Sequence, residues 1–212
     1  MQYVVSRWGG SLTRPWLPAR CALIGVALVA GCGPAPPATD LLHEAEQLYL
    51  VGKYDEAIPL LKQRLLQNPE DAGAHFYLGT CYLFSTDNRW LGIARGELET
   101  ALALFERQGK VCPIPRFDSS VYFEMICHIN IAKIYLSLIA DIESKPESLR
   151  FRQNQELLRT LLAECIKQYY KANRVAPGNP DVVALKGLIE SHTGPLPPEA
   201  PEYKAQPTPI SA

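Results

Sequence analysis

The chain has 212 residues, 47% of them hydrophobic and 20% charged, with a formal net charge of −1. This length and composition suit one globular domain with additional segments. Residues 1–31 contain three arginines and no acidic residue, so the rest of the chain carries 18 basic against 22 acidic side chains, a net charge of −4. A domain that binds nucleic acid through its phosphates should be basic, so this balance argues against a nucleic-acid partner.

The N-terminus has the pattern of an export signal. Three arginines precede the apolar run 21–30, which is shorter than the roughly 20 helical residues that a bilayer core requires. Residues 28–32, LVAGC, resemble the lipobox of bacterial lipoproteins. The resemblance implies that residues 1–31 are a signal peptide and that Cys32 is lipidated. The alternatives are an uncleaved anchor and a soluble secreted protein that is cut nearby.

This resemblance also implies a location. Two or three acyl chains on Cys32 would anchor the protein stably, whereas a single chain binds membranes only marginally. Gly33 follows the cysteine where, by analogy with enteric bacteria, an aspartate would favour retention at the inner membrane. We therefore expect an outer-membrane anchor facing the periplasm. Residues 32–39 are rich in proline and predict an extended tether that holds the domain off the lipid surface.

The stretch 52–69, GKYDEAIPLLKQRLLQNP, has the signals of a helical hairpin. Gly52 permits a tight turn, and Asp55 is expected to accept a backbone N–H where the next helix begins. Ala57 is small enough to let two helices approach closely. Asn68 and Pro69 predict the end of the helix.

The next hairpin opens after Asp71, and its first helix has the spacing of a known repeat. The spacing W-x2-L-G-x2-Y is typical of tetratricopeptide repeats (TPR). It matches His75, Leu78, Gly79 and Tyr82, with His in place of Trp. Ala45 and Gly79 are 34 residues apart, which is the length of that repeat. The chain thus resembles the TPR family over about residues 40–190. The resemblance implies an all-α fold, a right-handed superhelix of antiparallel helix pairs.

Apolar spacing places three hairpins in a domain spanning residues 40–192. The first is expected at 40–68 with Asp40 as its N-cap, and the second begins after Asp71. A connector at 108–120 contains Gly109 and two prolines, and a helix resumes near Ser119.

The third hairpin is longer than the family length by about 21 residues between Ala132 and Cys165. Apolar residues continue at helical spacing through this stretch, and Ser144–Glu147 has capping-box spacing. We expect two arms, each longer by about three turns. Residues 181–192 predict a helix that caps the stack, and the six prolines of 193–212 predict a disordered tail.

In the TPR family the first helix of each pair lines a concave groove. The matching positions here are Leu42, Glu46, Tyr49, Leu50, Phe76, Thr80, Leu83, Phe84, Ile129, Lys133 and Leu136. The set is mostly apolar, which favours a hydrophobic segment or an amphipathic helix of a protein partner. The alternative is that some of these residues are core, or are covered by the connector 109–118 or by the tail.

The cysteines beyond Cys32 favour structural roles. Cys81 and Cys165 occupy small-residue positions on apolar helix faces, which predicts buried thiols. Cys112 and Cys127 are close in sequence in an exported chain, but spacing alone leaves both a disulfide and two thiols open.

Neither a metal site nor an active site is predicted. His75 and His128 lie near equivalent points of successive repeats, yet neither has a carboxylate or a second histidine at i+4. We find no Gly-rich phosphate loop and no nucleophile motif. The sequence therefore predicts a protein that is not an enzyme and that takes no metal, cofactor or small-molecule substrate.

The expected function is a lipid-anchored periplasmic scaffold or adaptor that binds a protein segment in its groove during envelope, secretion or pilus assembly. Its layout is similar to that of the small repeat-built lipoproteins of outer-membrane β-barrel assembly and of type IV pilus biogenesis, although an elongated third repeat differs from both. An alternative is an accessory regulatory subunit of a cell-wall enzyme or protease. A third hypothesis is an enzyme with an unrecognised site.

Overall fold

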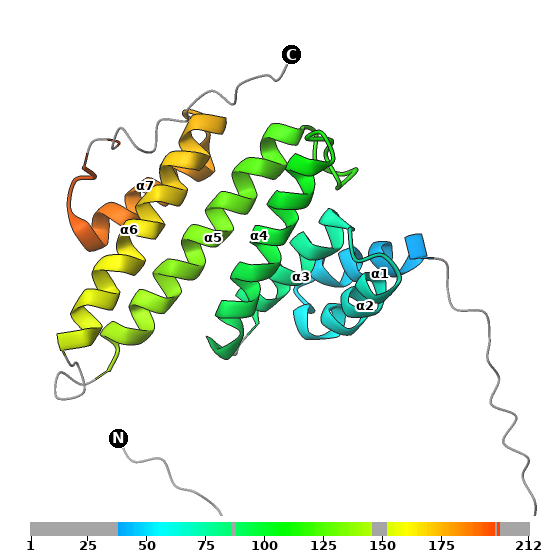
Figure 1. Cartoon of the computed structure of the whole chain (residues 1–212), viewed down its shortest axis with the longest axis horizontal. Helices are drawn as coiled ribbons and strands as arrows, with labels where there is room; N and C mark the ends of the chain where they lie inside the picture. Colours follow the sequence, from blue (N-terminus) through cyan, green and yellow to red (C-terminus); the bar gives the residue numbers. More distant parts are fainter. Residues whose placement is uncertain (1–37, 86–87, 146–151, 198, 200–212) are drawn as a thin grey trace, which may run out of the picture. The chain divides into compact units, whose positions relative to one another are not determined.

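The computed structural model describes residues 38–85, 88–145, 152–197 and 199 (Figure 1). All regular structure within these residues is helical, as the sequence predicts. The predicted signal peptide, Cys32 and most of the tether lie outside the described residues, as does the end of the tail from residue 200.

Successive α-helices pack as three pairs, α1 with α2, α3 with α4 and α5 with α6, and a single helix follows. The helices are α1 (Ala38–Leu50), α2 (Tyr54–Gln67), α3 (Ala72–Phe84), α4 (Leu91–Arg107), α5 (Ser120–Glu143), α6 (Arg152–Val175) and α7 (Pro180–Thr193). A short 3-10 helix, η1 (Asn88–Trp90), precedes α4.

Local signals act at several of the predicted turns and helix starts. Gly52 has a φ of +77° in the α1–α2 turn, a conformation that glycine adopts without steric cost. Asp71 caps α3, because its side chain accepts the N–H of Ala74 at 3.0 Å. Ser119 caps α5 in the same way and accepts the N–H of Tyr122 at 3.1 Å.

Two predicted caps are wrong. Helix α1 begins at Ala38, two residues before Asp40, because alanine is the strongest helix former and can carry the helix past the expected cap. Asp55 lies in the first turn of α2 instead of capping it, and accepts a hydrogen bond from Ser85 Oγ at 3.2 Å. Its charge still suits the positive end of the helix dipole. Asp55 thereby connects the start of α2 with the end of α3.

Helix α5 is at the centre of the packing and touches α3, α4, α6 and α7. It has the length and the hydropathy of a membrane span, but 61% of its most apolar window is buried inside the domain. Its apolar surface is therefore used for helix packing. Both α5 and α6 have 24 residues, against 13 and 14 for α1 and α2, which confirms the elongated third hairpin.

The first part of the predicted disordered tail is ordered. Helix α7 extends through Thr193, and residues 194–197 and 199 pack against α6 and α7. The prediction of disorder is wrong there, because the contacts that order this segment come from residues near 170 and 190. Amino-acid composition carries no information about such contacts.

Candidate binding surface

Three of the eleven predicted groove residues are part of the core. Phe76, Thr80 and Ile129 each have at most 1% of their surface exposed, so none of them can touch a partner in this structure. The connector covers the groove at this point, because Phe117 packs edge-on against Phe76 with ring centroids 5.5 Å apart. Thr80 Oγ1 donates to the carbonyl of Phe76 at 2.7 Å, and Asn130 Nδ2 donates to Thr80 Oγ1 at 3.4 Å.

Four other predicted residues come together in one pocket of about 390 Å³, here called the α3–α5–α7 pocket. Its lining comes from the end of α3, the middle of α5 and the end of α7, namely Leu83, Phe84, Lys133, Leu136, Ser137, Ala140, Leu188 and His192. The repeat pattern does not predict the α7 residues, because a capping helix is expected to cover the stack and not to line a site.

Apolar and cationic groups share this pocket. Phe84 is 42% exposed and Leu188 50% exposed, so two large apolar side chains of the pocket lining face solvent. Lys133 is half-buried, and its ammonium makes no ion pair with any side chain of the described chain. At the rim, His192 Nδ1 is 3.8 Å from Glu143 Oε2. The pocket can therefore accept an apolar group together with an anionic one.

The remaining four predicted residues lie on α1. Glu46 Oε1 accepts a hydrogen bond from Tyr77 Oη at 2.5 Å and is 3.4 Å from Arg116 Nε. Tyr49 packs between Tyr54 and Tyr77, with ring centroids 5.7 and 5.2 Å away. Leu42 is half-buried, and Leu50 is exposed.

An aromatic row connects α1 with the α3–α5–α7 pocket. Tyr54 contacts Phe84 at a centroid distance of 5.6 Å and Tyr49 on its other side, and Tyr49 then contacts Tyr77. Burial raises the pKa of Tyr49 to about 12. Burial and the hydrogen bond to Glu46 raise the pKa of Tyr77 further. Both hydroxyls therefore stay neutral at physiological pH.

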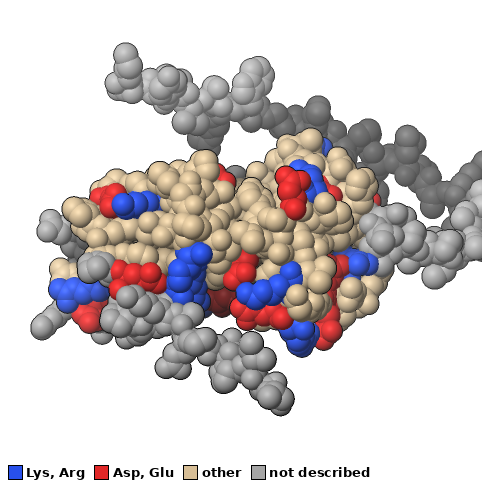
Figure 2. All heavy atoms as spheres, turned by 90° about the horizontal axis from the view of Figure 1, so that it is seen from above, with Lys and Arg blue, Asp and Glu red and all other residues tan. Residues whose placement is uncertain are grey.

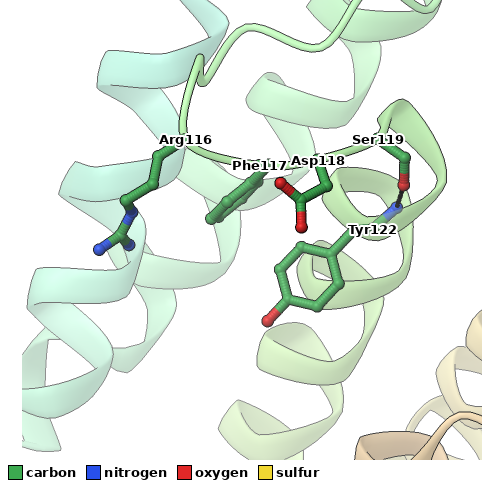
Figure 3. A pocket seen from close by; sticks show the side chains of 5 residues that line it. All are labelled: Arg116, Phe117, Asp118, Ser119 and Tyr122. Carbon is green, nitrogen blue, oxygen red and sulfur yellow. Dashed lines mark hydrogen bonds between the residues drawn. The ribbon is translucent and has the colours of Figure 1, made fainter.

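A second pocket of about 450 Å³ lies where the connector meets α5 (Figure 3). Its lining residues are Arg116, Phe117, Asp118, Ser119 and Tyr122. Phe117 and Tyr122 contact edge to face at 5.0 Å, while Arg116 is paired with Glu46. From the sequence alone, this segment is predicted only as a connector. An arginine and an aromatic residue directly after two prolines were the available signal.

On the face seen in Figure 2, acidic and basic side chains of the described residues lie close to one another. Figure 2 shows that Lys and Arg lie interspersed with Asp and Glu over the described part of the face it views.

Comparison with known proteins identifies the fold. No family model and no curated protein match the chain. Among solved structures, the crystal structure of a thermophilic TPR protein of Thermus thermophilus matches with a TM-score of 0.50 and 21% identity. The fold is TPR-like. The match covers 74% of this chain and 66% of that protein, so the chain spans about two thirds of its length.

Small residues hold the helices of the TPR-like domain together, as predicted. A Cβ atom added at Gly79 would lie 2.8 Å from Leu98 Cγ and 2.9 Å from the carbonyl oxygen of Ala94, so α3 and α4 are in close contact. Ala45 and Ala57 are fully buried between α1 and α2.

The cysteines that the structure describes are free thiols, so Cys112 and Cys127 are not bridged. Cys81 and Cys165 are fully buried, as predicted, and burial raises the pKa of each to about 12. Burial also raises the pKa of Cys127. These three thiols therefore remain protonated and act as small apolar side chains.

The two histidines that were weighed as metal ligands have structural partners. His75 Nδ1 is 2.6 Å from Glu97 Oε2 and Nε2 is 2.9 Å from the carbonyl oxygen of Pro69, so both ring nitrogens face acceptors. His128 Nδ1 donates to Gln168 Oε1 at 2.8 Å. Glu97 and Gln168 lie on other helices, so inspection of positions i+4 could not find them.

Proposed function

We propose that the TPR-like domain is a non-enzymatic scaffold that binds an apolar or amphipathic helical segment of another protein in the α3–α5–α7 pocket. The observation that carries this proposal is the exposure of Phe84 and Leu188 beside the half-buried Lys133, which has no ion-pair partner among the described residues. A half-buried ammonium without a counter-ion among the described residues favours a ligand that supplies one. The partner segment should therefore place an acidic residue next to its apolar anchors.

The same proposal places the domain at a membrane. Residues 28–32, LVAGC, support lipidation of Cys32 and an anchor facing the periplasm. Replacing Cys32 by Ala should abolish incorporation of a fatty-acid probe and leave the protein uncleaved or soluble. Continued labelling of the Cys32→Ala protein would contradict this part of the proposal and leave the binding role unaffected.

Site-specific photo-crosslinking tests the binding role. A photoreactive amino acid at position 84 in the membrane-anchored protein should crosslink a defined protein, identified by mass spectrometry after purification in detergent. The matched control is position 93 on α4, because Ile93 is 44% exposed, almost the same as Phe84, but does not line the pocket. If both positions crosslink the same protein with equal yield, the pocket is not a specific binding site.

Binding of the identified partner should then depend on the pocket. Phe84→Ala should weaken binding by about 2 kcal/mol, the usual range for an aromatic hot spot, while the unfolding midpoint changes little. Tyr49→Ala separates recognition from packing, since Tyr49 contacts two other rings and its loss should lower stability. Equal losses of stability in both variants would assign Phe84 to the core.

A further inference from the structure

The C-terminal segment after α7 is held by hydrogen bonds between its backbone and side chains of α6 and α7. Tyr170 Oη on α6 donates a hydrogen bond to the carbonyl oxygen of Pro197. The N–H of Leu196 donates to Glu190 Oε1 on α7 at 3.4 Å. Leu196 itself is half-buried and packs against the apolar core.

An ion pair fixes the end of this segment. Arg174 Nε on α6 is 3.0 Å from Glu199 Oε1, an atom that is buried and has no hydrogen bond of good geometry within the described chain. Glu199 follows Pro197 by two positions. The carboxylate therefore depends on Arg174 to compensate for its burial.

A surface of two tyrosines receives the segment. Tyr169 and Tyr170 lie with ring centroids 5.1 Å apart, and a hollow of about 430 Å³ remains between these rings, Lys186, Glu190 and the segment. Proline has no N–H, so an extended proline-rich chain offers mainly carbonyl oxygens and ring surfaces. A tyrosine offers both a ring surface and a hydroxyl donor, which suits both features, as in other proteins that recognise proline-rich segments.

We propose that this surface, formed by Tyr169, Tyr170, Arg174 and Glu190, is a binding site for proline-rich segments of the pattern Pro-Leu-Pro-x-Glu, and that in the isolated chain it is occupied by Pro195, Leu196, Pro197 and Glu199. The site recognises a carbonyl oxygen, the N–H between two prolines and an acidic residue, each through a different side chain. It is separate from the α3–α5–α7 pocket, because α7 uses Leu188 and His192 there and Lys186 and Glu190 here.

A peptide of residues 193–203, TGPLPPEAPEY, labelled with a fluorophore at its N-terminus, tests the proposal in the full-length chain. Leu196→Ser combined with Pro197→Gly should release the chain's own segment, because it removes the buried side chain and the stiff backbone. Fluorescence anisotropy should then show at least tenfold tighter peptide binding than to the unchanged chain, in which the tethered segment competes at high effective concentration.

Two controls make the result specific. Adding Arg174→Ala to the released chain should weaken peptide binding at least fivefold, and a Glu199→Gln peptide should lose the same amount. Equal affinity of the released and unchanged chains, or equal binding of a peptide with shuffled order, would overturn the proposal. If the released chain loses helical content by circular dichroism, Glu199→Lys alone replaces it, and tenfold tighter peptide binding than to the unchanged chain is again the required result.

Discussion

The helices of the first two pairs have 13 to 17 residues, whereas α5 and α6 have 24 each. In the short pairs, close contact is set by small residues such as Gly79 and Ala57. The ring of Phe76 on α3 packs against Phe123 on α5 and so joins the second pair to the third. The long pair instead packs aliphatic side chains of α5, including Ile131 and Ile134, in its central turns.

The extra length of the long pair is buried unequally. In α6 the stretch 165–172 contains four buried side chains, whereas no side chain in the described stretch 154–164 is fully buried. Leu157 in this outer part is 46% exposed. Extra helical turns therefore contribute little burial where they have few neighbouring helices, although their sequence pattern is equally regular.

The largest expected effect is a difference in stability between substitutions at the centre and in the outer part of the long hairpin. Ile134→Ala should reduce the free energy of unfolding by about 3 kcal/mol, because Ile134 is fully buried and its truncation leaves a cavity. Leu157→Ala on the outer part of α6 should cost less than about 1 kcal/mol, since its side chain is nearly half exposed. Urea unfolding followed by circular dichroism measures both values, and similar losses would show that the outer arm is as well packed as the centre.

In the short hairpins the corresponding test adds one methyl group at a close contact between two helices. Gly79→Ala should destabilise the domain by about 2 kcal/mol, because the new Cβ meets the fixed backbone carbonyl of Ala94 at 2.9 Å. Gly96→Ala on α4 is the matched control, since no atom lies within 4 Å of its added Cβ, and it should stabilise by about 1 kcal/mol through helix propensity. A stabilising effect at both positions would mean that α3 and α4 are farther apart than described.

The stabilities of the two regions should also respond to pH in opposite directions. In the long hairpin, burial lowers the pKa of His128 to about 4, against an ordinary value of 6.5. The unfolded chain then binds more protons than the native one between these values, so stability is complete above pH 6.5 and falls as the pH drops towards 4. His128→Gln should remove roughly 2 kcal/mol of the difference in unfolding free energy between pH 8 and pH 5. An unchanged pH dependence in this variant would contradict a neutral, buried imidazole.

In the short hairpins, His75 should show the reverse dependence with a smaller amplitude. Burial disfavours its charged form, but hydrogen bonds to Glu97 and to the carbonyl of Pro69 together raise its pKa. Its contribution to stability is therefore complete below pH 6.5 and is lost as the pH rises through the pKa of the folded state. NMR titration of the ring protons should give a midpoint above 6.5 for His75 and below it for His128. Equal titration midpoints for the two histidines would contradict the expected difference in pH response between the two regions.

The sequence predicted only part of the lining of the candidate pocket, because the α7 residues were not expected there. Lys133 and Leu136 on α5 do meet Leu83 and Phe84 on α3, because equivalent positions of successive first helices face the same side. The same rule selected residues that the structure buries. Their exposure depends on what covers them, and the connector residue Phe117 reaches back over α3 to do so.

The sequence by itself determined the helices, most of their boundaries and the close contact at Gly79, because periodicity, capping and side-chain size act within a few residues or one repeat. Only the tertiary structure decided which part of the groove is open, which side chains accompany His75 and His128, and that Pro197 lies against Tyr170. These features join segments 22 to 41 residues apart. Their formation depends on the summed packing of all the helices, which no local pattern encodes.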